Sequence, residues 1–175
     1  MDITVNIDGM DRILEKLASI AGDGKVKAGV LEGATNAKGT SVLQYAPIQE
    51  FGGIIPVTKK MRGFLAAVYG IYLKKTTGVI SIPSRPFLRT TYEQNADKWV
   101  EHLGRAIEAG RSVEDALELV GMEMEDDIIN TIKSNLPPPN SEATNKIKAQ
   151  EAPAALGKTL QFTGTLIHSI KHEVE

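Results

Sequence analysis

The chain has 175 residues, with 20 basic and 22 acidic side chains, a formal net charge of -2 and no cysteine. This length suffices for one domain with its own core, and the lack of Cys excludes disulfides, thiolate metal sites and a cysteine nucleophile. The balanced charge argues against a free-standing nucleic-acid-binding protein, because phosphate contacts require an excess of Lys and Arg.

The first quarter of the chain predicts alternating strands and helices. Residues 3–7 alternate apolar with polar side chains, as a half-buried strand does. Residues 10–20 place apolar side chains at helical spacing. A second strand is expected at 26–30, where it could pair with the first. Residues 32–40 are rich in Gly, Ala, Thr and Asn and are expected to form a mobile loop.

The next quarter predicts two short helices and a strand. Residues 41–51 predict a helix that begins late or bends at Pro47 and ends at the following glycine pair. The apolar segment 63–73 is well short of the roughly 20 residues that span a membrane, so we expect a buried or interface helix. Residues 79–82 predict a short strand. The side chains of the first helix that are expected to point inward are Val42, Leu43, Ile48 and Phe51.

Two long amphipathic helices are expected in the second half. One follows Pro86 and ends at Gly110, and the other begins at Ser112 with a loose capping box. Residues 136–160 contain three consecutive prolines and a polar tract, which predict a long mobile loop or arm. Alternating apolar residues from Leu166 onward predict a closing strand.

These elements predict an α+β fold in a single domain over residues 1–175. Its architecture is expected to be a small antiparallel sheet packed against two long amphipathic helices, with extended loops. No internal repeat at solenoid or propeller periods is visible in the sequence. The N-terminus lacks the basic and apolar regions of a secretory signal, so export is not expected.

The sequence offers little for catalysis or metal binding. It contains neither a G-x-x-x-x-G-K-[ST] phosphate loop nor a G-x-S-x-G nucleophile motif. No H-E-x-x-H surrounds His168 and His172, so these side chains and His102 are expected to be surface imidazoles. The acidic run at 123–127 predicts a solvated helix face. We therefore expect no enzyme activity, catalytic residue, cofactor or metal. The remaining enzyme alternative is a small hydrolase whose catalytic residues are dispersed along the sequence.

Basic side chains stand out in two places. One group surrounds the apolar segment 63–73 and could contact DNA phosphates, cover an apolar helix with its stems, or meet an acidic patch on another subunit. At the start of the first long helix, Arg85 and Arg89 flank Phe87 and are expected to form ion pairs with the following helix or with another subunit. The first group comprises Lys59, Lys60, Arg62, Lys74 and Lys75.

Three segments carry a pattern that runs through the chain. They are Tyr45-Ala46-Pro47-Ile48-Gln49-Glu50-Phe51-Gly52, Ile82-Pro83-Ser84-Arg85-Pro86-Phe87-Leu88-Arg89, and Thr163-Gly164-Thr165-Leu166 with Ser169-Ile170. In this order they resemble the virion-morphogenesis and tail-completion proteins of long-tailed bacteriophages. The resemblance covers nearly the whole chain. Phe162 departs from it, since the family usually has Asp before the Thr-Gly pair.

The resemblance implies a structural subunit that forms a ring, commonly a hexamer, at the head-tail junction of the virion after assembly in the host bacterial cytoplasm. The implied partners are further copies of the chain, the connector or head-closure protein, and a tail-terminator or tail-tube protein. Genomic DNA would pass through the ring, and no membrane is involved. A tail-terminator or head-closure role stays open, and a small DNA-binding module is the alternative outside this class.

The resemblance also implies structural roles for the motif residues. Pro83 and Pro86 are expected to fix the approach to the long helix, because each locks its own φ and restricts its predecessor. Phe51 and Phe87 are expected to anchor this junction in the core, and the motif glycines to permit tight turns. The candidates for structural or interface roles are Phe51, Gly52, Pro83, Arg85, Pro86, Phe87, Arg89, Gly164 and Leu166.

Overall fold

The computed structural model describes residues 24–31, 35 and 39–175. The strand expected at 3–7, the helix expected at 10–20 and most of the loop expected at 32–40 lie outside these residues. The described elements, in order, are β1 (Val26–Val30), η1 (Val42–Gln44), α2 (Ala46–Phe51), β2 (Gly53–Pro56), α3 (Lys59–Tyr69), β3 (Val79–Ile82), α4 (Phe87–Glu108), α5 (Val113–Lys133), α6 (Glu142–Glu151), η2 (Pro153–Ala155), α7 (Thr165–His168) and β4 (Ile170–Val174).

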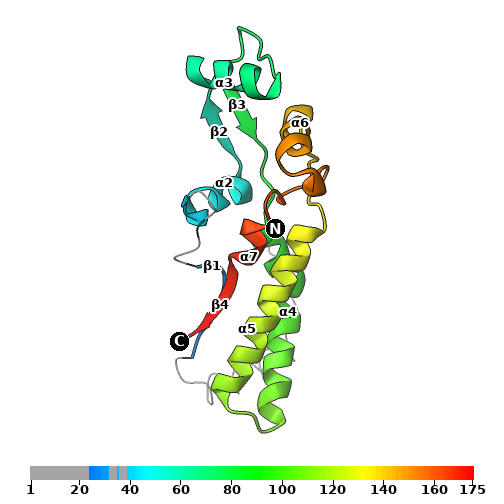
Figure 1. The fold of residues 1–175 in the computed structure, drawn as a ribbon. Coiled ribbons are helices and arrows are strands. Elements are labelled where there is room, and N and C mark those ends of the chain that lie inside the picture. Colours follow the sequence, from blue (N-terminus) through cyan, green and yellow to red (C-terminus); the bar gives the residue numbers. More distant parts are fainter. Residues whose placement is uncertain (1–23, 32–34, 36–38) are drawn as a thin grey trace, which may run out of the picture.

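The molecule is elongated, with two long helices at one end and a small helix-and-strand unit at the other (Figure 1). The antiparallel hairpin of α4 and α5 forms one end, and the β1–β4 ribbon runs along α5. At the other end, β2, α3 and β3 project together, with α6 beside them. The predicted α+β class is confirmed, including the antiparallel sheet packed against two long helices. A second antiparallel pair, β2 with β3, was not expected.

Buried polar contacts as well as apolar packing join the two long helices. Ser112 caps α5 by accepting a hydrogen bond from the backbone N–H of Asp115, as the sequence predicts. The indole Nε1 of Trp99 on α4 donates to the carboxylate of Asp127 on α5 at 2.7 Å. Hydroxyl groups of Thr91 and Thr131 are hydrogen-bonded at 2.7 Å between the same helices. These bonds set the register of α4 against α5.

The β1–β4 ribbon covers the hairpin near the middle of the molecule. Val26 lies opposite Val174 and Val30 opposite Ile170. Ile170 is 1% exposed and joins a core cluster with Ile128 and Ile132 of α5. The predicted closing strand is therefore confirmed over its second half. Its first half is instead the short helix α7.

We call residues 53–82, from β2 to β3, the arm. The two strands pair antiparallel, and Thr58 caps α3 by accepting from the backbone N–H of Met61. The strand expected at 79–82 is confirmed, and so is a helix in the apolar segment. Tyr69 is the buried residue of α3, whereas Phe64 is 54% exposed. Of the two expectations for this helix, burial within the chain is therefore wrong for most of its length, and an interface helix stays a prediction.

The prediction of a long loop or arm over 136–160 is wrong, because this segment contains α6 and η2. Ser141 caps α6 by accepting from the backbone N–H of Thr144. Lys148 and Ala155 are buried, and the ammonium group of Lys148 donates to the carbonyl groups of Lys158 and Gln161. The segment has few large apolar side chains, so its order comes from capping and tertiary contact and not from local hydrophobic pattern.

The inward face predicted for 41–51 is only partly correct. Val42 is fully buried, but Leu43 is 41% and Phe51 67% exposed. The chain forms two short helices here, and the second begins with Pro at its first turn. This break turns the carboxylate of Glu50 inward in place of an apolar side chain.

In the described part of the chain, no helix is long and apolar enough to cross a membrane.

Candidate functional site at the motif junction

Glu50, near the end of α2, joins the first two sequence motifs. Its side chain is buried, and its carboxylate accepts hydrogen bonds from the backbone N–H groups of Leu88 at 2.9 Å and Arg89 at 3.1 Å. Pro86 occupies the N-cap position of α4 and has no side-chain oxygen to offer. Glu50 therefore supplies this helix with its N-terminal cap from a distant part of the chain, where a negative charge also complements the helix dipole.

Main-chain contacts hold the same junction together. The backbone N–H of Arg85 donates to the carbonyl of Gln49 at 2.7 Å, and the hydroxyl of Ser84 donates to the carbonyl of Glu50 at 2.7 Å. Gly52 has φ +79°, and a β-carbon there would lie 3.0 Å from the backbone nitrogen of Ser84. The expectation of a turn that requires glycine is confirmed at this position.

The two motif phenylalanines differ in burial. Phe87 is fully buried and belongs to the core cluster with Val42 and Leu166, so its predicted anchoring role is confirmed. Phe51 does not reach the core, and the prediction for it is wrong. Its exposed ring instead lies 4.9 Å from the guanidinium carbon of Arg89, a cation–π contact.

The two motif arginines do not pair with α5, so the expected ion pairs with the next helix are wrong. The Nε of Arg89 donates to the carboxylate of Glu50 at 3.1 Å. Arg85 is 6% exposed and donates from Nε to the carbonyl of Pro138 at 3.0 Å and from Nη2 to that of Pro139 at 3.3 Å. Burial lowers the pKa of Arg85 from its ordinary value.

The third motif comes to the same place from the end of the chain. Gly164, with φ +79°, precedes α7, as its predicted turn role requires. Leu166 is 5% exposed and packs in the cluster with Phe87. Phe162, the residue that departs from the family pattern, has its ring centre 5.9 Å from the ammonium group of Lys148. The three motifs therefore meet at one junction.

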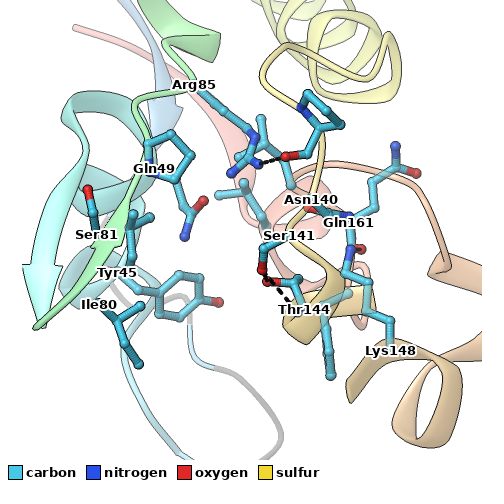
Figure 2. A pocket seen from close by; sticks show the side chains of 16 residues that line it. Tyr45, Gln49, Ile80, Ser81, Arg85, Asn140, Ser141, Thr144, Lys148 and Gln161 are labelled. Carbon is cyan, nitrogen blue, oxygen red and sulfur yellow. Dashed lines mark hydrogen bonds between the residues drawn. The ribbon is translucent and has the colours of Figure 1, made fainter. Parts of the chain in front are cut away.

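A cavity of about 440 Å³ lies beside this junction (Figure 2). Gln49 and Arg85 of the first two motifs line it together with Leu166 of the third. Lys148 of α6 also lines it, although this side chain is only 3% exposed, and its ammonium group donates to the carbonyl groups of Lys158 and Gln161. Burial, and secondly the charge of Arg85, lower the pKa of Lys148.

No family model, curated protein or solved structure matches this chain.

The basic residues expected around the apolar segment lie on the arm and have different surroundings. Arg62 donates to the carbonyl groups of Leu73 at 3.2 Å and Lys74 at 2.8 Å, and also to that of Thr77. It thus braces the connection between α3 and β3. The side chains of the other members, Lys59, Lys60, Lys74 and Lys75, are exposed.

His172 and part of the acidic run differ from expectation, whereas His102, with its side chain 41% exposed, and the exposed His168 lie at the surface as expected. His172 is not a surface imidazole, because its side chain is 12% exposed and lies between Glu125, at 2.7 Å from Nδ1, and Glu118, at 3.1 Å from Nε2. His102 pairs with Glu123 at 2.8 Å. The predicted solvated face of 123–127 is therefore wrong for several members. Among the described residues, no group of three or more His, Asp or Glu forms a metal-binding cluster.

Two buried charged residues of the junction were missed by sequence reasoning. Glu50 had a signal, since it belongs to the first motif, but its burial does not follow from any local pattern. The sequence gives no signal for the burial of Lys148, because a lysine in a polar tract is usually exposed. The partners of Glu50 lie 38 and 39 residues further on, and the carbonyl partners of Lys148 lie 10 and 13 residues further on.

Proposed function

We propose that this chain is a non-enzymatic structural subunit of a tailed bacteriophage, which assembles into a ring at the head-tail interface. In this role it joins the tail to the capsid connector and leaves a passage for DNA. The proposal has two supports. One is the resemblance of the three motifs to tail-completion proteins, and the other is the surface of the arm.

The arm carries the proposal because it exposes several large apolar side chains. Exposed apolar side chains on a projecting element do not stabilise a monomer, because they stay in contact with water. Contact with another subunit would bury them. Subunits of a ring meet through two different faces, and an arm that reaches a neighbour provides one of them. The exposed fractions are 70% for Ile54, 54% for Phe64, 49% for Val68, 83% for Tyr72 and 52% for Val79.

The contacts at the base of the arm favour a defined subunit angle. Glu50, just before β2, caps α4, and Gly52 lies close to Ile82 at the end of β3. Two residues of α6 also contact the arm. The hydroxyl of Tyr69 donates to the carboxylate of Glu151, and the ammonium group of Lys146 donates to the carbonyl of Gly70 at 2.9 Å. A closed ring requires each subunit to meet the next at the same angle, and these contacts hold the arm in one orientation.

The first experiment is native mass spectrometry of the purified protein at rising concentration, combined with electron microscopy of any particles. We expect rings of about six copies. The double variant Phe64→Asp with Val68→Asp should dissociate them, because both carboxylates would be buried at the contact. Met122→Asp is the control, since Met122 is 46% exposed on α5, away from the arm. A protein that stays monomeric at all concentrations and is absent from virions would contradict the proposal.

A DNA-binding module is the second candidate, favoured by the exposed lysines on the arm. It predicts that affinity for duplex DNA falls steeply as salt is added, with a slope set by the number of phosphate contacts. Lys74→Gln with Lys75→Gln should reduce this slope by about two. Absence of salt-sensitive binding would remove this candidate.

Within the structural proposal, the position of the protein in purified virions would distinguish tail completion from a tail-terminator or head-closure role.

A further inference from the structure

The cavity beside the motif junction has the size of a small-molecule site. Its volume of about 440 Å³ lies within the range of roughly 300–1,000 Å³ that is usual for such sites. Figure 2 shows Tyr45 and Ile80 on one side, from the segment before α2 and from β3. Ser141, which caps α6, and Thr144 of α6 lie on the other side. The site is therefore built where the arm, the core and α6 meet.

Two buried cations line this cavity. Arg85 is 6% exposed and Lys148 is 3% exposed, and none of the described residues that line the cavity is Asp or Glu. Buried charges in proteins are normally paired with an opposite charge, because leaving water is costly. Backbone carbonyls of Pro138, Pro139, Lys158 and Gln161 accept hydrogen bonds from the two side chains, and these dipoles compensate the charges only in part.

Neutral donors surround the same space. The hydroxyl groups of Ser141 and Thr144 are hydrogen-bonded to each other at 2.9 Å at the start of α6, and both residues line the cavity. The side chains of Gln49 and Tyr45 point into the gap between the two walls (Figure 2). The hydrogen bonds of Arg85 to the proline carbonyls use Nε and Nη2, so Nη1 is not held by them.

We propose that this cavity binds a small organic carboxylate, whose anionic group lies near Arg85 and Lys148 and whose apolar body lies against the remaining wall. A carboxylate matches the planar guanidinium group of Arg85. The apolar body is required because Ile80, Ile82 and Leu166 supply much of the lining, and because the volume exceeds that of a bare inorganic anion. This inference goes beyond the proposed function and holds whether or not the chain forms a ring.

The test uses the full chain and a matched pair of probes, benzoate and its neutral isostere benzamide, with inorganic phosphate as a third probe. A ligand that binds only the folded state raises Tm. At about ten times its Kd, benzoate should raise Tm by roughly 3–6 °C relative to benzamide at equal ionic strength. An equal effect of benzoate and benzamide would overturn the proposal. A shift with phosphate alone would also overturn it, since that result assigns the site to a bare anion.

Two lysine variants test whether benzoate binds in the cavity. Lys148→Met keeps the length of the side chain and removes its charge, so the benzoate shift should fall at least severalfold. Lys146→Met is the control on the same helix, because Lys146 contacts Gly70 outside the cavity, and its benzoate shift should equal that of the wild type. An unchanged shift in Lys148→Met would overturn the proposal.

Lys148→Met can fail to fold, because Lys148 also holds two backbone carbonyls. The wild type then provides the decisive measurement, an NMR titration of its lysine side chains with and without benzoate. Bound carboxylate should raise the pKa of Lys148 and leave the side-chain chemical shifts of Lys146 unchanged. An unmoved pKa of Lys148 at saturating benzoate would refute the assignment.

Discussion

The imidazole ring of His172 on β4 lies against the backbone of Gly121 in the middle of α5. A β-carbon on Gly121 would lie 2.8 Å from Cγ of His172 and closer still to Cδ2. Glycine in a helix interior costs about 1 kcal/mol relative to Ala, so its presence here has a packing reason. The absent side chain lets the terminal strand approach the helix and places His172 between Glu118 and Glu125.

We expect Gly121→Ala to destabilise the fold by about 1–3 kcal/mol, because the overpacked methyl group must displace His172 or separate β4 from α5. Chemical denaturation measures this change. Gly63→Ala is the matched control, since Gly63 lies in α3 with nothing within 4 Å of a built β-carbon. That variant should be neutral or up to about 1 kcal/mol more stable. Equal stability of the two alanine variants would contradict the packing argument.

The His172 cluster should make stability depend on pH. Burial by itself lowers the pKa of His172, but hydrogen bonds to Glu125 and Glu118 raise it above its ordinary value of 6.5. A raised pKa in the folded state means that this contribution to stability is fully present below about pH 6.5 and is lost as pH rises through the folded pKa.

Urea denaturation of the wild type and His172→Gln between about pH 5 and 9 tests the sign of this effect. The stability difference between the two should be largest at the acid end and should shrink as the pH rises. Both proteins carry His102→Gln as a common background, because His102 of α4 pairs with Glu123, which lies on the same helix as Glu118 and Glu125. A difference that is constant, or that grows with pH, would show that His172 has no raised pKa.

Glu50 should be among the most sensitive polar residues. Glu50→Ala leaves two N–H groups of α4 and the Nε of Arg89 without their carboxylate acceptor, so we expect a loss of about 2–4 kcal/mol. Glu50→Gln keeps one acceptor oxygen and should lose less. The exposed Glu93 of α4 is the control, and Glu93→Ala should stay within about 0.5 kcal/mol of the wild type. Thermal unfolding that ranks Glu50→Ala with Glu93→Ala would argue against the capping role.

The two motif phenylalanines should differ in their effect on stability. Phe87→Ala removes a fully buried ring and should cost about 3–5 kcal/mol. Phe51→Ala removes an exposed ring with a cation–π contact to Arg89 and should cost about 1 kcal/mol or less. Denaturation midpoints of the two variants check this order. A large loss in Phe51→Ala would mean that the ring is buried in solution, as it would be at a subunit contact.

Local pattern was sufficient for the two long helices, α4 and α5. The helices after Pro86 and Ser112 were expected because helical spacing and capping residues act over a few positions. The same approach failed for residues 136–160, where polar composition predicted a loop and the chain forms α6. It also failed for Phe51, because the break at Tyr45, between the two short helices, changes which side of the second helix faces the core.

The sequence by itself determined the α+β class, the two long helices, the strands at 26–30 and 79–82, and the glycine turns at Gly52 and Gly164. Each depends on periodicity or on backbone freedom within a few residues. Only the tertiary structure decided that Glu50 caps a helix 38 residues further on, and that His172 lies against a carboxylate 47 residues earlier. Such partners are brought together by packing of the whole chain, and buried charges are stable only where that packing supplies an acceptor or donor.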